Sequence, residues 1–473
     1  MKKSLSRAIA ITAVCAAGLS GALVTNTSAV AGSASAHHAS KTATQAGHRA
    51  AAVRTPFGYK ADVFGTKLLV DGVEVKSLKD GYAQQRCTAA AGRETYKNSI
   101  LSIPEDLTDL VHLSLTNNRS VTYKKGNTYG VKGISTVGDI AIGGDVPGLG
   151  KLPQIKIEGL QSVSDAFNKN GKFGHKESFG FKGISIDYDG TVVDGTPLAQ
   201  LLDIVNQVAA PISQIVNQVI ELLQSVAGNI IEIPGLGALG LGTTRGSAGK
   251  NQAISESYAL KILINATGND SVLQLGRART RIARPVPAGV FRGTATGLDL
   301  FQDVLHLGNL GQRSIPCEGT NGKVVTQKTA HIGVLGGLVD LTGITYKFMG
   351  KQSKSGFAKG MIGTNIGTVS VPSLNLVIKG ISSKVNLLKK ANTKRVISKV
   401  DTGVLTVLLN GEEVALPEPG KSVKIGDNDW LVMRPLLKKN YFGAETSALS
   451  LKLGSMGGQI IDLGTAAGRI FPR

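Results

Sequence analysis

The chain contains an internal duplication, and this feature constrains its fold more than any other. Cys87 and Cys317 lie 230 positions apart, and the segments that follow them match in the same order. Collinear self-similarity of this kind is the signature of repeated structural units. It divides the chain into two related units, at 53–285 and 286–473. The matching segments are Thr122-Tyr123-Lys124 with Thr345-Tyr346-Lys347, Val146-Pro147-Gly148-Leu149 with Val371-Pro372-Ser373-Leu374, Gly159 with Gly380, Ser255–Leu260 with Ala444–Leu449, and Leu275-Gly276 with Leu463-Gly464.

Both units have the pattern of short strands joined by glycine turns. The chain has 60 glycines among many short Val, Ile and Thr runs, which favours strands and tight turns. Asp71-Gly72 and Asn410-Gly411 each stand between alternating apolar runs and predict hairpin turns. Asp194-Gly195 occupies the place of Asn410-Gly411 in the first unit. We therefore expect a mostly β fold of two glycine-rich, sandwich-like units.

One segment of the first unit has helical periodicity. Apolar residues recur at spacings of three and four over 197–232, and Pro211 is expected to bend or break this helix. The second unit has no counterpart, so the helix is an insertion. Its polar face carries Gln and Asn but no Lys or Arg, which favours packing over a sheet above binding to a membrane surface. Partner binding is the remaining alternative.

Residues 1–31 have the pattern of an export signal. Three basic residues precede an apolar stretch, and small residues allow cleavage after Ala31 or after Ala36. A retained membrane-spanning anchor is the alternative. Residues 32–52 lack apolar periodicity and predict a flexible N-terminal tail. We therefore expect a secreted or cell-wall-associated protein with no transmembrane segment in its mature chain.

The cysteine count fits an exported protein. Removal of the signal also removes Cys15, which leaves two cysteines in an oxidising compartment. We therefore predict a disulfide between Cys87 and Cys317, with two free, buried thiols as the alternative. For a loop of 230 residues, the chain-entropy model gives a stabilisation of about 5 kcal/mol.

Positive charge is concentrated in the second unit. The formal charge of the chain is +20, and 323–399 carries thirteen Lys or Arg against one acid, whereas 183–276 carries a net charge of −5. Such a field attracts polyanions and anionic surfaces. The densest part lacks the interleaved aromatics that single-stranded nucleic-acid binders use to stack bases, so no nucleic acid is expected. We predict contact with an anionic cell-wall polymer or surface; a solvated face without a ligand is the alternative. The predicted contact residues are Lys379, Lys384, Lys389, Lys390, Lys394, Arg395 and Lys399.

No motif predicts catalysis or a cofactor. Gly235–Gly240 fits G-x-G-x-x-G, but Pro234 precedes it and no helix start follows, so it does not predict dinucleotide binding. The histidines outside the tail are isolated and lack metal-ligand spacing. We therefore predict a non-enzymatic structural or binding protein with no cofactor and no metal. The alternative is a secreted hydrolase that acts on wall polymer or polysaccharide through carboxylates that the sequence does not identify.

The export signal, the opening Phe57–Gly65 and the ending from Leu463-Gly464 to Arg469-Ile470 resemble the actinobacterial choice-of-anchor P family of exported proteins. The resemblance covers nearly the whole chain after the signal. It implies a surface or secreted role on a Gram-positive cell and no catalytic residues. In 416–420 this chain has Pro419 where a sortase motif has threonine, and no apolar span follows. We therefore expect release, or retention at the wall through charge.

Overall fold

A computed structural model describes residues 52–472, except for 71–72, 76–80, 100–109, 147–149, 189–193, 208–209, 227–229, 235, 243, 265–270, 303–304, 335–338, 434–436 and 457. The predicted export signal and the predicted tail up to residue 51 lie outside the described residues.

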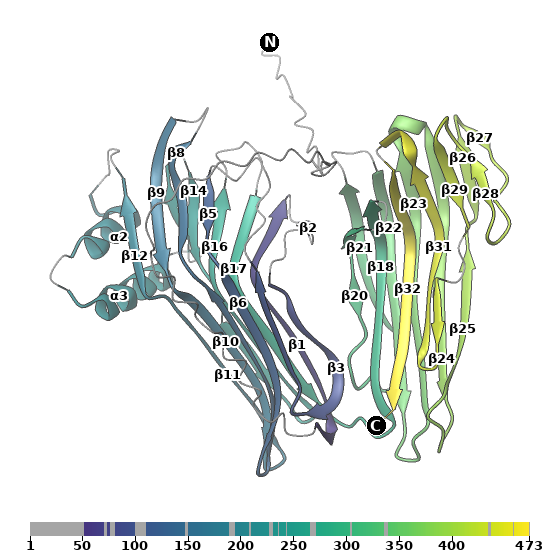
Figure 1. The fold of residues 1–473 in the computed structure, drawn as a ribbon, viewed down its shortest axis with the longest axis horizontal. Helices are drawn as coiled ribbons and strands as arrows, with labels where there is room; N and C mark the ends of the chain where they lie inside the picture. The colour runs from purple at the N-terminus through teal and green to yellow at the C-terminus, as the bar shows by residue number, and fades with distance from the viewer. Residues whose placement is uncertain are drawn as a thin grey trace, which may run out of the picture.

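The described residues form two antiparallel β-sandwiches that lie side by side, one from each half of the chain (Figure 1). The first sandwich contains residues up to 283 and the second begins at residue 289. The prediction of a mostly β, sandwich-like fold is therefore confirmed.

One layer of the first sandwich is a single sheet, and the opposite layer is bent. Sheet A runs in the order β13 (Ile230–Ile233), β14 (Gly237–Leu241), β16 (Gln252–Ile264), β17 (Ser271–Ala283), β1 (Val53–Val70) and β2 (Val73–Val75), with β15 (Thr244–Ala248) paired to β16 and β3 (Ala83–Ala91) paired to β1. The opposite layer consists of sheet B, in the order β11 (Lys172–Gly180), β10 (Leu160–Lys169), β7 (Thr128–Val137), β6 (Thr116–Lys125) and β4 (Glu94–Ser99), and sheet C, in the order β12 (Gly183–Asp187), β9 (Gly150–Glu158), β8 (Ile140–Val146) and β5 (Val111–Leu113). Only one or two residues separate each strand of sheet C from its neighbour in sheet B, so the two sheets form one bent layer.

The second sandwich repeats this plan with longer, continuous strands. Sheet D runs in the order β19 (Leu305–Leu310), β18 (Gly289–Gln302), β32 (Gln459–Pro472), β31 (Gly443–Leu453), β29 (Asp429–Val432) and β28 (Ser422–Lys424), with β20 (Arg313–Ser314) paired to β18 and β30 (Lys438–Asn440) paired to β31. Sheet E runs in the order β21 (Val325–Val334), β22 (Val339–Gln352), β23 (Ala358–Val371), β24 (Leu376–Lys389), β26 (Thr406–Leu409) and β27 (Glu412–Glu413), with β25 (Val396–Gly403) paired to β24.

Two matched pairs of glycines occupy equivalent places in the two sandwiches. Gly276 interrupts β17 with φ 60°, and Gly464 interrupts β32 with φ 62°. Gly159 lies between β9 and β10 with φ 58°, and Gly380 lies within β24 with φ 66°. A positive φ strains any residue with a Cβ, so glycine is needed wherever these long strands bend.

One of the segment matches is wrong. Tyr123 points to the outer face of sheet B, whereas Tyr346 on β22 is fully buried in the core. Each of the two strands has a bend at the equivalent place. Counted from this bend, Asn118 on β6 stands where β22 has Tyr346. Matching Tyr123 to Tyr346 shifts the strand by five residues, and any odd shift turns every side chain to the other face.

The helical insertion forms two helices that pack over the first sandwich. α2 (Pro197–Val205) is capped by the Thr196 hydroxyl, and α3 (Ile212–Ser225) begins after Pro211, so the predicted break is confirmed. Leu201 and Leu223 are fully buried in a cluster shared with sheets A and C. The helices pack against the edge strands β12 and β13 and the neighbouring β14, so the prediction that the insertion packs on a sheet is confirmed.

The three predicted hairpin dipeptides have different outcomes. Asn410-Gly411, with φ 54° and 85°, joins β26 to β27 as a hairpin. Asp71-Gly72 lies outside the described residues, although Val70 and Val73 on either side of it are paired. Asp194-Gly195 was predicted to occupy the place of Asn410-Gly411, which is wrong, because it leads into the cap of α2.

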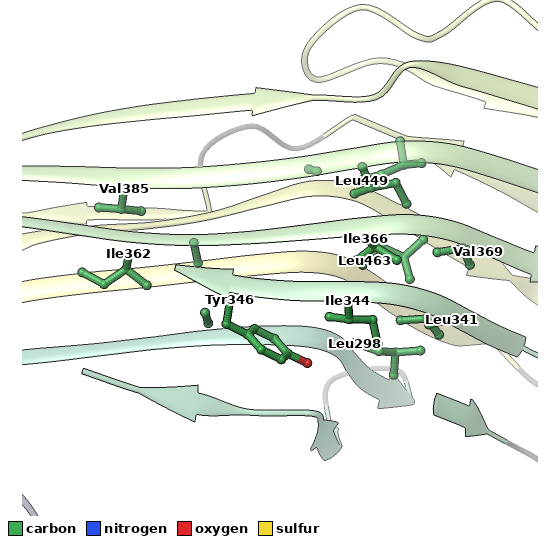
Figure 2. Packing of buried hydrophobic residues seen from close by; sticks show 14 of the residues in the cluster. Leu298, Leu341, Ile344, Tyr346, Ile362, Ile366, Val369, Val385, Leu449 and Leu463 are labelled. Carbon is green, nitrogen blue, oxygen red and sulfur yellow. The ribbon is translucent and has the colours of Figure 1, made fainter. Parts of the chain in front are cut away.

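The cores of the two sandwiches differ. The second has one large apolar cluster between sheets D and E, in which residues such as Tyr346, Ile362 and Val385 point between the layers (Figure 2). The buried hydrophobic residues of the first fall into three separate clusters. Between these clusters, small polar side chains fill the interior.

The predicted disulfide joins the two sandwiches. Cys87 on β3 is bonded to Cys317, with a Cα–Cα distance of 5.4 Å. Two residues at equivalent places donate hydrogen bonds across the junction near it: Lys60 on β1 donates to Ser314, and Arg292 on β18 donates to the carbonyl of Cys87. Lys60 and Arg292 hold equivalent places on equivalent strands, as expected for units related by a pseudo-twofold axis.

Candidate anionic-ligand surface

The outer face of sheet E carries lysines from five neighbouring strands. Side chains alternate between the two faces of a strand, so the buried positions of β22, β23 and β24 point to the core and the positions between them point out. Seven lysines occupy outward positions: Lys328, Lys347, Lys351, Lys359, Lys379, Lys384 and Lys399. They come from a stretch of more than 70 residues, and the sheet gathers them on one face.

Two aspartates partly neutralise this face. Asp401 lies 3.4 Å from the Lys384 ammonium and 3.6 Å from that of Lys399, and Asp340 lies 3.1 Å from the His331 ring. Exposed pairs of this kind are weak and are screened by salt. Glu413 on β27 is a further acid on this side of the sheet, and seven lysines against these three acids leave the face positive.

Further positive charge lies where two turns end this face, at the bottom of the second sandwich in Figure 1. The exposed Lys354 lies in the β22–β23 turn, and the exposed Lys390, Lys394 and Arg395 lie in the β24–β25 turn. The Lys389 ammonium ties the two turns together by donating a 2.6 Å hydrogen bond to the carbonyl of Gly356. We call the outward lysines and these turns the basic face.

The predicted contact residue Lys389 does not belong to the basic face. It ends β24 in an inward position and is only 5% exposed. Burial lowers the pKa of its ammonium below the usual value. The strand alternation turns Lys389 inward to hold the turns, while Lys390 lies outside.

The other predicted contact residues divide between the sheet and its turn. Lys379, Lys384 and Lys399 lie on the sheet, and Lys390, Lys394 and Arg395 lie in the turn. Five members of the face were not among the predicted contact residues: Lys328, Lys347, Lys351, Lys354 and Lys359. The even spacing of Lys347 and Lys351 within one strand was the signal that could have found two of them.

The first sandwich also has lysines on its corresponding face, which the sequence analysis did not predict. The outer face of sheet B carries Lys125, Lys132, Lys169, Lys172 and Lys176. Among them, Tyr123 donates a 2.9 Å hydrogen bond to Asp165, and burial raises the pKa of this carboxyl above its usual value. The negative stretch 183–276 lies on other elements. Its negative charge therefore did not predict the charge on the outer face of sheet B.

The most buried acid of sheet A is held by arginines. Burial alone would raise the pKa of Glu256, but the guanidinium groups of Arg277 and Arg245 outweigh burial and hold the pKa below its usual value. Arg245 Nε donates a 2.9 Å hydrogen bond to this carboxylate. Glu256 is therefore a charged member of an ion-pair network.

The described part of the chain offers little that resembles a catalytic site. A shallow depression of about 460 Å³ lies at the opposite end of sheet E, and it is lined by Ser370, Pro372, Asn375, Leu376, Val377, Asn410 and Gly411, none of which is acidic or basic. Among the described residues, no group of three or more His, Cys, Asp or Glu is placed to hold a metal ion. No described helix is long and apolar enough to cross a membrane.

Comparison with known proteins gives no family. No family model matches the chain, and no curated protein matches it significantly. Among solved structures, a crystal structure of lipopolysaccharide binding protein aligns at 10% identity over 77% of this chain and 85% of that one, with a TM-score of 0.12. A similarity this weak supports no conclusion about fold or function.

Proposed function

We propose that this protein is an exported, non-enzymatic protein of the Gram-positive cell surface or medium, and that its basic face binds an anionic cell-wall polymer. The observation that carries the proposal is the gathering of seven lysines on the outer face of sheet E. Export rests on the predicted signal at 1–31. The resemblance to the choice-of-anchor P family supports a surface role.

The residue type and the extent of the face fit a repetitive polymer. Lysine is a compact charge on a flexible stem, so it can follow anionic groups without fixed geometry. The outward positions belong to continuous strands, and neighbouring strands of a sheet lie about 4.8 Å apart, so the charges are spread over an extended surface. A polymer that carries one anionic group per repeat can contact several lysines at once.

Retention of the full chain on isolated Gram-positive cell walls tests this proposal. We expect strong retention at low salt and release at high salt, because exposed charges are screened over a short Debye length. A variant with Lys347→Gln, Lys351→Gln and Lys384→Gln should elute at much lower salt than the parent.

The matched control replaces three exposed lysines of sheet D, with Lys438→Gln, Lys439→Gln and Lys452→Gln. It removes the same net charge but leaves the basic face intact. Its elution should therefore change less than that of the sheet E variant. Equal shifts for the two variants would show that net charge alone causes retention, and salt-independent retention would refute the electrostatic mechanism.

A further inference from the structure

The basic face also contains a diagonal of apolar side chains. Met349 on β22 lies opposite Met361 on β23, and Leu388 on β24 lies opposite Ile397 on β25. Met361 and Leu388 are diagonal neighbours across β23 and β24, because Met361 pairs with Asn386 and Leu388 is the next outward residue. The four side chains therefore form a continuous apolar line across four strands.

These side chains are accessible to solvent. Ile397 is 52% exposed, and Met349, Met361 and Leu388 are partly exposed. They point away from the core, since Phe348, Ile362 and Leu387 next to them in sequence fill the interior. Cross-strand apolar pairs at these outward positions add only about 0.2–1 kcal/mol each to the sheet, and their continuation across four strands leaves an apolar line open to solvent.

Lysines border the diagonal on both sides. Lys351 and Lys359 are paired and lie on the turn side of the two methionines, in the same row as Leu388. Lys347, Lys384 and Lys399 lie on the other side, in the same or the next row of outward residues. A solvated basic face or a contact for a water-soluble polymer would need only the lysines, whereas the apolar line between them matches a ligand with anionic head groups above apolar chains.

We infer that this face docks on the surface of a bilayer that contains anionic phospholipid. The lysine side chains reach the phosphate groups, and the methionine, leucine and isoleucine side chains enter the boundary between head groups and acyl chains. Lysines near an anionic leaflet and apolar side chains buried at the interface both favour such binding. Methionine suits a fluid partner because its unbranched side chain adapts its shape. This inference uses the surface of the proposed function but assigns it a different ligand.

Vesicle binding by the purified full chain tests the inference. The probes are vesicles of phosphatidylcholine alone, vesicles of phosphatidylcholine with phosphatidylglycerol, and soluble polyphosphate as a lipid-free polyanion. We expect the parent chain to bind polyphosphate, and to bind the mixed vesicles more tightly than vesicles of phosphatidylcholine alone. Residues 1–31 are common to every variant, so differences between variants report only the face.

The central variant is Met349→Ser with Met361→Ser. Loss of two apolar side chains should weaken binding to mixed vesicles about tenfold and leave polyphosphate binding unchanged. Met349→Leu with Met361→Leu keeps the apolar surface and should bind vesicles like the parent. Leu405→Ser is the control, because Leu405 lies between β25 and β26, away from the diagonal, and is 75% exposed. The single tryptophan, Trp430, lies on sheet D, so its emission reports folding of every variant independently of binding.

Replacement of lysines separates the two ligands. Lys351→Gln with Lys359→Gln should weaken binding to mixed vesicles about 30-fold and also weaken polyphosphate binding. Vesicle binding without polyphosphate binding would overturn the polymer proposal and support the lipid one. Polyphosphate binding together with unchanged vesicle binding by the serine variant would overturn the lipid inference and leave the polymer proposal intact. If the lysine variant binds both probes like the parent, neither stands.

Discussion

The two sandwiches share one plan, but their layers are held together differently. Counted from the shared bend, Asn118 and Ser120 of the first sandwich stand where the second has Tyr346 and Phe348. Ser164 stands where the second has Val385. All these side chains are buried, with at most 1% exposure. The same backbone plan therefore encloses a polar seam in one copy and an apolar core in the other.

The polar seam is a set of hydrogen bonds between the facing layers. The Ser164 hydroxyl donates to the carbonyl of Ser255 at 2.8 Å, the Ser255 hydroxyl lies 3.0 Å from the carbonyl of Lys176, and the Ser135 hydroxyl donates to the carbonyl of Phe64 at 2.8 Å. In the second sandwich, Thr364 makes such a bond to the carbonyl of Thr465.

This difference teaches that a duplicated fold can keep its strand plan while it changes the forces in its core. Hydrogen bonds add about 1 kcal/mol each, whereas a buried aromatic or aliphatic side chain adds about 2–3 kcal/mol. Buried polar atoms without a hydrogen-bond partner in the protein occur in both sandwiches, for example at Asn118 and Ser120 in the first and at Ser383 and Ser398 in the second. The difference in stability comes from the larger apolar side chains of the second core. We therefore expect the first sandwich to be the less stable of the two.

Removal of the disulfide should give the largest effect and separate the two cores. Cys87→Ala with Cys317→Ala releases a loop of 230 residues, for which the chain-entropy model gives a loss of about 5 kcal/mol. Calorimetry should then resolve two transitions, with the first sandwich unfolding at the lower temperature. A single transition in the untied chain would show that the two cores still unfold as one unit.

Truncation within the second core should have the next largest effect. Phe348→Ala removes a fully buried ring from the continuous apolar cluster and should lower the free energy of unfolding by about 4 kcal/mol. Ser120→Ala, at the matching place of the first sandwich, should have little effect because its hydroxyl has no protein partner. Denaturant titration of the two variants measures the contrast, and equal losses would contradict it.

A reciprocal exchange tests the seam directly. Ser164→Val adds volume and removes the donor to Ser255. In the chain without the disulfide, it should destabilise the transition of the first sandwich by about 2 kcal/mol. Val385→Ser buries an unpaired hydroxyl and should destabilise the second transition by a similar amount. If Ser164→Val stabilises the protein, the seam is not a source of stability.

The smallest effect concerns pH. Burial raises the pKa of Asp165 in the folded state above the unfolded value of 3.8, so the folded state holds this proton more tightly. The stabilisation that this proton gives to the folded state is therefore complete below pH 3.8 and is lost as the pH rises through the raised pKa. Asp165→Asn should be slightly more stable than the parent at neutral pH, with a difference that vanishes in acid. A difference that grows in acid would contradict the assigned direction.

Sequence patterns predicted the features that depend on local chemistry. The glycine and β-branched content predicted the strands, Pro211 predicted the break between α2 and α3, and Asn410-Gly411 predicted its hairpin. The cysteine count predicted the disulfide.

The composition of the candidate surface could not be predicted in the same way. Whether a lysine joins a face depends on strand parity, and each bend at a glycine such as Gly380 resets that parity. Lys389 and Lys390 are therefore neighbours in sequence, but Lys389 points inward and Lys390 is exposed. The face also draws on five strands whose order in the sheet is set by long-range pairing, which a charge count along the chain does not contain.

The equivalent placement of the two disulfide cysteines bears on the origin of the chain. Cys87 and Cys317 hold equivalent positions, so a single ancestral unit would present its one cysteine to the same cysteine of a second molecule. Such a self-complementary contact is the interface of a symmetric homodimer. Fusion of the two genes would have made this association independent of protein concentration. It also freed each half to evolve its own core, because a substitution no longer appeared in both partners at once.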